Sequence, residues 1–197
     1  MRRTAMVGLM VVALMSAFLL ASGAGDGAGA GDGAGAGDGF KREGQRDAKD
    51  KLEGKPPPKL AVEGWVNTDG EDFTFDSAKG KVIVIDFWGT WCPPCRAAMP
   101  HLKELLDKHQ KDGLVVIGIH TSNGGESMAA YVKEQELPWP MAVDVQDKTV
   151  SAFGVDSYPD YYVIDRAGNL RVADLSNGDL DRTVEALLKE PAPVASK

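Results

Sequence analysis

The two cysteines are the residues of this chain best suited to covalent chemistry, and they lie together in Trp91-Cys92-Pro93-Pro94-Cys95. Two thiols at this spacing can close a small disulfide ring and reopen it, whereas a permanent disulfide over so short a loop would restrain the unfolded chain only slightly. With only three histidines in the chain, a closed zinc site is not expected, and half a metal site would need a second chain to complete it. The spacing therefore predicts thiol–disulfide exchange without a metal or a cofactor.

The local sequence places both thiols at the start of a helix. Residues 93–109 carry apolar side chains on one face and charged side chains on the other, the pattern of an amphipathic helix. Pro93 is well tolerated at the first helical position, which makes Cys92 the residue at the helix tip. We expect Cys92 to be the exposed, attacking thiol, and Cys95, one turn inward, to resolve the mixed disulfide.

The helix dipole and free backbone N–H groups at this end favour a thiolate at Cys92. Pro93 and Pro94 have no N–H, however, so the nearest backbone donors are those of Cys95 and Arg96. We therefore expect fewer hydrogen bonds to the sulfur than a loop containing glycine would supply.

Asp86 is the next candidate for chemistry, at the end of an apolar segment just before the cysteine pair. Residues 81–88 contain the unbroken run Val82-Ile83-Val84-Ile85, which is typical of a central strand buried on both faces. Burial raises the pKa of a carboxyl group, so Asp86 beneath the pair could accept a proton from Cys95 during resolution. The alternative interpretation is a structural ion pair with a nearby lysine such as Lys81.

The rest of residues 60–190 predicts an α/β domain. The segment 65–75, with Asp-Gly in its middle, predicts an N-terminal hairpin. The other expected elements are a buried strand over 114–119, a helix over 127–137, a second hairpin of strands 161–165 and 170–175, and a last helix from 180 to 188. Right-handed crossovers make the two buried strands parallel neighbours in a mixed central sheet with helices on both faces. The cysteines then follow the C-terminal end of a central strand, where open α/β sheets place their sites.

The N-terminus predicts export. Arg2 and Arg3 precede an uncharged apolar run over residues 5–21, and small residues follow at 21–24. This pattern predicts a secretory signal over residues 1–22, or an N-terminal anchor if the segment is not cleaved. Either way the domain is expected to be extracytoplasmic (periplasmic), where disulfides persist, and to meet a membrane only through this segment.

Residues 23–59 have little apolar sequence. Gly, Ala and Asp alternate over residues 23–39, and residues 40–59 are mostly charged and end in three prolines. We therefore expect a flexible linker over residues 23–59 and a disordered tail over residues 191–197.

The overall composition excludes one class of partner. The 197 residues are 43% hydrophobic and 26% charged, as in an ordinary globular protein. Their formal net charge of −7 argues against nucleic acid as the main partner, because phosphate binding needs a basic face.

The stretch from Val84 to Pro100 resembles the active-site segment of thioredoxin-like proteins, most closely the exported TlpA/ResA group of thiol-disulfide oxidoreductases. The resemblance covers residues 60–190 and implies a thioredoxin-like fold with a βα-type insertion around residues 121–140. It also implies protein thiols and disulfides as substrates, as in keeping apocytochrome c reduced, and a membrane-embedded thiol electron donor. A protein-disulfide oxidase or isomerase, and a peptide-binding module without redox activity, remain as alternatives.

The resemblance assigns a substrate surface as well. The family's cis-proline, which faces the cysteine pair, matches Pro159, so the backbone of Tyr158 is implied to pair with an extended substrate segment. Trp91, Pro93 and Pro94 are expected to complete this surface.

Four further positions bear on the chemistry. Ala98 stands where the exported group often has Glu, and Gly89 stands where a thiol peroxidase would need Thr or Ser. Asp160, directly after the proline, is expected to bring negative charge near the attacking thiol and to disfavour its thiolate. His120 closes the second buried strand; we expect a structural role, with a place near the site as the alternative.

Overall fold

The computed structural model of this protein describes residues 38–192. The predicted signal or anchor over residues 1–22, linker residues 23–37 and nearly all of the predicted tail lie outside the described residues. No helix within residues 38–192 combines the length and the apolar composition needed to cross a lipid bilayer.

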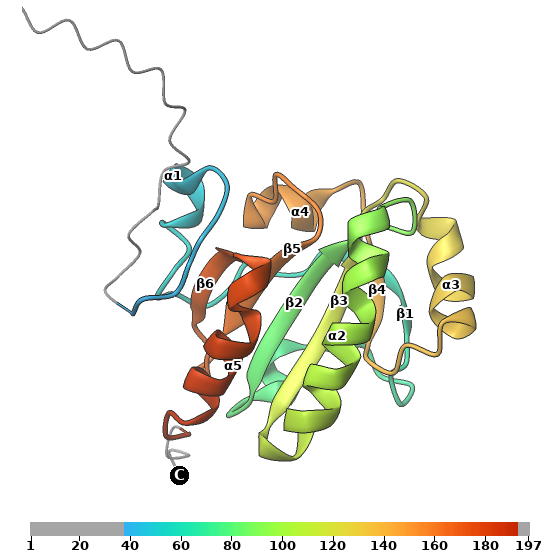
Figure 1. Ribbon diagram of the computed structural model, residues 1–197. Helices are drawn as coiled ribbons and strands as arrows, with labels where there is room; N and C mark the ends of the chain where they lie inside the picture. The colour runs from blue at the N-terminus through green and yellow to red at the C-terminus, as the bar shows by residue number, and fades with distance from the viewer. Residues whose placement is uncertain (1–37, 193–197) are drawn as a thin grey trace, which may run out of the picture.

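A mixed sheet of six strands forms the centre of the molecule, in the order β1-β4-β3-β2-β5-β6 (Figure 1). The strands are β1 (Val62–Val66), β2 (Val82–Trp88), β3 (Leu114–His120), β4 (Met141–Asp144), β5 (Asp160–Ile164) and β6 (Leu170–Leu175). The α-helices are α1 (Arg46–Lys49), α2 (Pro93–His109), α3 (Met128–Glu134), α4 (Lys148–Phe153) and α5 (Leu180–Leu188). The predicted parallel pairing of the two buried strands, the hairpin of β5 and β6, and the bounds of α2 are confirmed.

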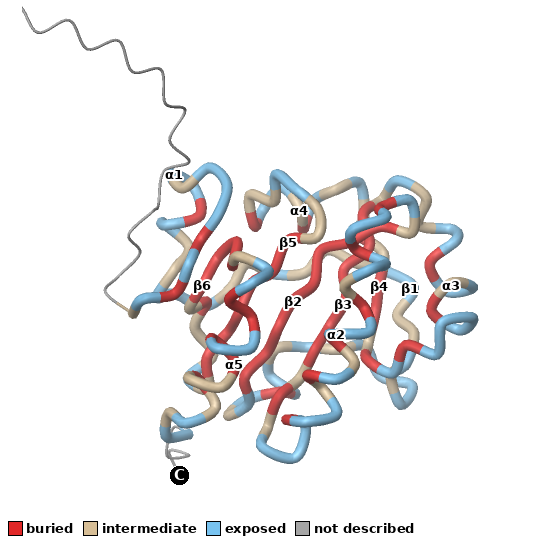
Figure 2. The backbone as a smooth tube through the Cα atoms, viewed as in Figure 1, coloured by how far each residue is buried: buried red, intermediate tan, exposed pale blue. Residues whose placement is uncertain are grey.

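Strand β2 is buried along its whole length (Figure 2), and it separates two apolar cores. Successive strand side chains point to opposite faces of a sheet. Val82, Val84 and Trp88 accordingly contribute to the core that contains both cysteines and side chains of α2 and α5. Ile83, Ile85 and Phe87 contribute to the core on the other face, with Phe153 of α4. The helices α2 and α5 lie in front of the sheet in Figure 1.

The predicted N-terminal hairpin is wrong. Strand β1 pairs antiparallel with β4 at an edge of the sheet, and Phe75 begins a short 3₁₀ turn instead of a second strand. The rings of Trp65 and Phe73 lie 5.8 Å apart, and those of Phe73 and Phe75 6.0 Å apart. The alternating aromatic residues that predicted a hairpin therefore pack against one another across a loop, where a strand pairing was expected.

The predicted insertion contains α3, and two elements after it had no clear signal in the sequence. Strand β4 has four residues and pairs parallel with β3 over Gly118–His120. Helix α4 follows directly, and the Asp144 carboxylate accepts hydrogen bonds from the backbone N–H groups of Thr149 and Val150 at 2.9 and 2.8 Å. Both elements are too short for periodicity to identify them.

The predicted linker is also wrong from residue 38 onward. Residues 38–55, here called the strap, pack along the free side of β6. The Arg42 side chain is fully buried and pairs with Asp38 at 3.0 Å and Glu53 at 2.8 Å. The charges that predicted a solvated segment are thus paired with one another and with the sheet edge.

Candidate active site

Cys92 and Cys95 form a disulfide at the first turn of α2. Cys92 is the N-cap residue, and Pro93 and Pro94 occupy the next two positions. The Cys95 N–H lies 3.2 Å from the Cys92 sulfur, as predicted, whereas the Arg96 N–H donates to the Cys92 carbonyl oxygen instead. Of the two expected donors, one therefore reaches the sulfur.

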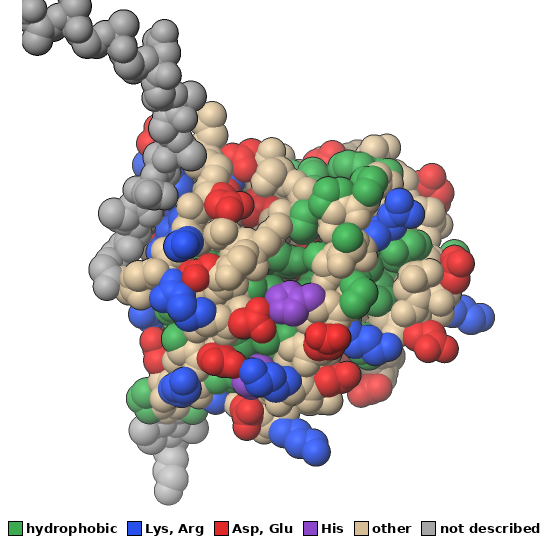
Figure 3. Space-filling view, in the orientation of Figure 1, with side chains coloured by type: hydrophobic (Ala, Val, Ile, Leu, Met, Phe, Trp, Pro, Cys, Tyr) green, Lys and Arg blue, Asp and Glu red, His purple; other side chains and the backbone are tan. Residues whose placement is uncertain are grey.

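The burial of the two cysteines differs from expectation. Cys92 is 3% exposed and Cys95 1%, so exposure hardly distinguishes them in the oxidised pair. The solvent-facing residues here are Trp91, which is 47% exposed, and the exposed Pro93 and Pro94. Figure 3 shows hydrophobic surface gathered at this end of the molecule, where α2 begins. Cys92 and Cys95 therefore differ in their position on the helix, with Cys92 at its tip, and not in their exposure to solvent.

The indole of Trp91 is held in place from two sides. Its Nε1–H donates to the Asn123 carbonyl oxygen at 3.0 Å, and its ring meets that of Tyr158 at a centroid distance of 5.6 Å. A Cβ atom added at Gly89 would lie 2.7 Å from two indole atoms. The glycine is therefore needed for this placement of Trp91, and the hydroxyl residue of a thiol peroxidase does not fit there.

The expected proline loop lies beside Trp91. The Tyr158–Pro159 peptide bond is cis, as the resemblance implies, and precedes β5. Phe87 pairs with Asp160 in the register of β2 and β5, so the loop is next to the end of β2 from which the active-site segment leaves. The Tyr158 side chain is half-buried, and this burial raises the pKa of its hydroxyl to about 12.

Asp86 lies on the cysteine-bearing face of the sheet. It sits between Val84 and Trp88, which share a core with both cysteines, and alternation along the strand puts its side chain on that face. It is 1% exposed, and its Oδ1 has no hydrogen-bond partner. Burial raises the pKa of this carboxyl group to about 8.

The alternative ion pair for Asp86 is wrong. Lys81 is exposed, and no cation within the described residues lies in ion-pair contact with Asp86. Desolvation is the only cause of its raised pKa. The Asp86 carboxyl group therefore has no ionic partner among the described residues.

His120 has the expected structural role, and it is close to the site. Its Nε2 accepts from the Thr90 N–H at 2.8 Å, and its Nδ1 donates to the Thr121 carbonyl oxygen at 2.7 Å. These partners require the neutral ring protonated at Nδ1. Burial lowers the pKa of His120, which favours that neutral form. The histidine thus fixes the segment leading to Cys92, and its pairing with Thr90 had no signal in the sequence.

The expectation that Asp160 brings charge near the attacking thiol is wrong. Tyr161 and Val163 of β5 belong to the cysteine-bearing core, while Tyr162 and Ile164 belong to the opposite one. Asp160 therefore points away from the cysteines, and its Oδ2 lies 3.9 Å from the Lys49 ammonium of the strap. The cluster of Asp160 with Lys49, Asp156 and Asp174 was missed from the sequence, because its members come from three separate segments.

Comparison with known proteins agrees with this geometry. Residues 54–173 match the AhpC/TSA family. The chain belongs to the AhpC/TSA family. Its relatives include the thiol-disulfide oxidoreductase ResA of Bacillus cereus ATCC 10987, 28% identical over 152 residues, which are 77% of this chain and 86% of that protein. ResA of a second Bacillus cereus strain is 30% identical over 123 residues, 62% of this chain and 69% of that protein.

A solved structure of a thioredoxin-like protein has a similar fold. The solution structure of a thioredoxin-like protein in its oxidised form is 31% identical, with a TM-score of 0.61 over 72% of this chain and 99% of that one. The chain is therefore a thioredoxin-like thiol–disulfide oxidoreductase of the ResA type, and protein thiols are its class of substrate.

Proposed function

We propose that this oxidoreductase reduces disulfides in extracytoplasmic proteins, with Cys92 as nucleophile, Cys95 as resolving thiol and Asp86 as proton acceptor. The observation that carries the proposal is the buried, unpartnered carboxyl group of Asp86 on the cysteine-bearing face of β2. A pKa of about 8 lies near the working pH, so this group can both take up and return a proton.

The reaction begins with the reduced pair. The Cys92 thiolate attacks one sulfur of the substrate disulfide, which forms a mixed disulfide and releases one substrate thiolate. Cys95 gives its proton to the Asp86 carboxylate, and the resulting Cys95 thiolate attacks the Cys92 sulfur. The Cys92–Cys95 disulfide forms, the second substrate thiolate leaves, and two electrons have passed from the pair to the substrate.

The substrate is proposed to lie along the backbone at Tyr158 and across the exposed surface of Trp91, Pro93 and Pro94. An extended segment can pair with exposed backbone groups, which gives affinity with little demand on sequence. The edge-to-face contact of Trp91 with Tyr158 supports this placement, because it joins the loop to the segment that bears the nucleophile.

The hydrogen bonding of Cys92 supports the reducing direction. A protein disulfide is a strong oxidant when its reduced form is stabilised. Here one backbone N–H, that of Cys95, reaches the Cys92 sulfur, and the two prolines have none to offer. We expect a thiolate with so few backbone donors to be weakly stabilised, so that the pair favours the disulfide and donates electrons.

A redox titration tests this direction. Equilibration of the full chain with mixtures of reduced and oxidised dithiothreitol is expected to give a potential near the about −270 mV of thioredoxin, not near the about −120 mV of a strong oxidase. A potential at the oxidising end would instead make the chain a disulfide oxidase.

Trapping in cells tests the substrates and the compartment together. Cys95→Ala leaves the mixed disulfide on Cys92 without a resolving thiol, so substrates remain attached and are identified by mass spectrometry. We expect extracytoplasmic proteins, with apocytochrome c among the candidates, and a membrane-embedded thiol carrier as electron donor. The double variant Cys92→Ser/Cys95→Ala is the control and should trap nothing. Capture of cytoplasmic proteins alone would contradict export.

A further inference from the structure

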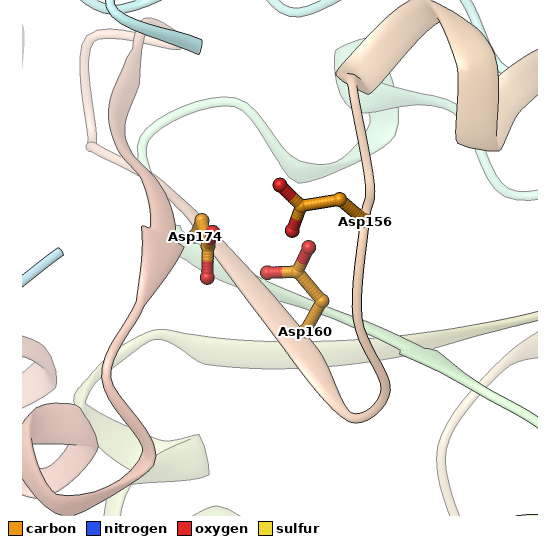
Figure 4. A group of neighbouring side chains, drawn as sticks. All are labelled: Asp156, Asp160 and Asp174. Atoms are coloured by element: carbon orange, nitrogen blue, oxygen red, sulfur yellow. The ribbon is translucent and has the colours of Figure 1, made fainter. Parts of the chain in front are cut away.

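Three carboxyl groups, those of the buried Asp160 and Asp174 and the exposed Asp156, surround one buried lysine of the strap. The side chains of Asp156, Asp160 and Asp174 point toward one another, with an oxygen of each within 4.8 Å of the others (Figure 4). The Lys49 ammonium is 1% exposed; it lies 2.8 Å from Asp156 Oδ1, 3.9 Å from Asp160 Oδ2, and in direct contact with Asp174. The place where a metal ion would sit among these oxygens is thus taken by an ammonium group of the chain itself.

Two of these carboxyl groups flank the proposed substrate-pairing backbone. Asp156 lies two residues before Tyr158, and Asp160 directly follows Pro159. Lys49 therefore contacts the chain on both sides of the Tyr158–Pro159 peptide bond.

The strap holds Asp156 through both of its carboxylate oxygens. While Oδ1 contacts Lys49, Oδ2 accepts a hydrogen bond from the Gln45 backbone N–H at 3.0 Å. The loop between α4 and β5 is therefore attached to the strap at one side and, through Tyr158, to the indole of Trp91 at the other.

Lys49 is the one described cation within ion-pair distance of these three acids. Burial and the neighbouring Asp174 raise the pKa of Asp160 to about 9, so this carboxyl group is neutral near pH 7, and the negative charges that the ammonium compensates are those of Asp156 and Asp174. Without the ammonium, Asp156 and Asp174 would lose their shared counter-ion, and the loop would lose its ionic connection to β6.

We propose that Lys49 is a positioning residue for disulfide exchange: it fixes the loop on both sides of the Tyr158–Pro159 bond and thereby aligns the backbone that receives polypeptide substrates. The inference rests on the proposed pairing of substrates at Tyr158. Lys49 touches no substrate and acts on how a polypeptide is held, not on the sulfur chemistry itself.

The test compares a polypeptide substrate with a small one. In Lys49→Met, the KM for reduction of the insulin disulfides should rise roughly threefold to thirtyfold. The kcat with insulin, and both constants with oxidised glutathione, which is too small to span the loop, should stay unchanged. Lys51→Met is the matched control, because Lys51 is an exposed lysine of the same strap, and it should leave all four constants as in wild type.

A second pair of variants keeps the proposal testable if Lys49→Met does not fold. Asp156→Ala removes both contacts of Asp156 with the strap, while Lys49 keeps Asp174 and Asp160; the exposed Asp72→Ala is its control. In ¹H–¹⁵N spectra the Trp91 indole N–H should shift in Lys49→Met and Asp156→Ala but not in the controls, because its ring neighbour Tyr158 moves.

The outcomes separate the two proposals. Equal losses toward insulin and glutathione, or an unchanged insulin KM with an unmoved indole resonance, would overturn the positioning role. A wild-type protein that reduces glutathione but not insulin would defeat the proposed substrate class before any variant is compared.

Discussion

The indole of Trp91 and the ring of Tyr158 meet edge to face, with centroids 5.6 Å apart and ring planes at 82°. One ring precedes the nucleophilic cysteine and the other precedes the cis-proline, so this contact joins the two halves of the site. Aromatic pairs in this geometry contribute about 0.5–1.5 kcal/mol beyond the burial of their surface.

A double-mutant cycle measures that contact. We expect Trp91→Ala and Tyr158→Ala to be coupled by about 1 kcal/mol in the free energy of unfolding, followed by urea denaturation. Strictly additive losses would show that the two rings are neighbours without interacting.

Asp86→Asn should slow the release of substrate from the mixed disulfide. The amide cannot accept the Cys95 proton, so resolution should fall by roughly 10²-fold or more while the first attack by Cys92 is retained. Stopped-flow measurement with a fluorescent peptide disulfide separates the two steps. Asp107→Asn makes the same change at an exposed position of α2 and serves as control; equal rates for Asp86→Asn and wild type would contradict the role.

The same substitution should change how stability depends on pH. Because the pKa of Asp86 is raised from 3.8 to about 8, the folded state holds a proton that the unfolded state loses over this range. The free energy of unfolding of wild type should therefore fall, relative to Asp86→Asn, by up to roughly 1 kcal/mol per unit as pH rises from 4 to 8. Urea titrations at several pH values measure the difference, and parallel profiles would refute it.

Gly89→Ser should displace Trp91. The added Cβ would lie 2.7 Å from the indole, so we expect a loss of about 1–3 kcal/mol in unfolding free energy and a shifted indole resonance. Gly178→Ser is the matched control, since a Cβ there meets nothing within 4 Å. A stable Gly89→Ser protein with an unmoved Trp91 would disprove the steric account.

His120 should make the site sensitive to acid. The pKa of His120 is lowered in the folded state, so the unfolded state takes up a proton first as pH falls below 6.5. The stabilisation that the neutral ring provides is lost as pH falls through the lowered pKa of the folded state. Protonation at Nε2 also ends the hydrogen bond from the Thr90 N–H. We expect wild type to lose stability relative to His120→Gln below pH 6.5 in urea titrations. An identical pH dependence of the two proteins would argue against it.

The sequence predicted those parts of the site that depend on local pattern. The apolar run of β2 and the face of α2 are periodic, and the proline after Cys92 defines the helix start, so β2, α2 and the cysteine pair followed directly. The face of β2 on which Asp86 lies could also be predicted, because Asp86 and its buried neighbours belong to the same strand and alternate along it.

Features that depend on distant segments were not predictable in this way. The charges of Arg42 and Lys49 indicate a solvated linker unless their partners are known, and the partner Asp174 of Lys49 lies 125 residues further along the chain. The face of the sheet toward which Asp160 points depends on which residue begins β5. The sequence does not define that residue, because a proline loop precedes the strand. The packing of the strap and the orientation of Asp160 are both determined by contacts between segments that are far apart in the sequence.

The strap has a consequence for association between molecules. Its backbone hydrogen bonds to Leu170, Asp174 and Ser176 occupy groups of the outer strand that would otherwise be open. An uncovered strand of this kind is a template on which a second copy can add, and such addition leads to aggregation. A shortened polypeptide beginning at residue 60 would keep the whole redox centre and yet lose its protection against self-assembly into insoluble material.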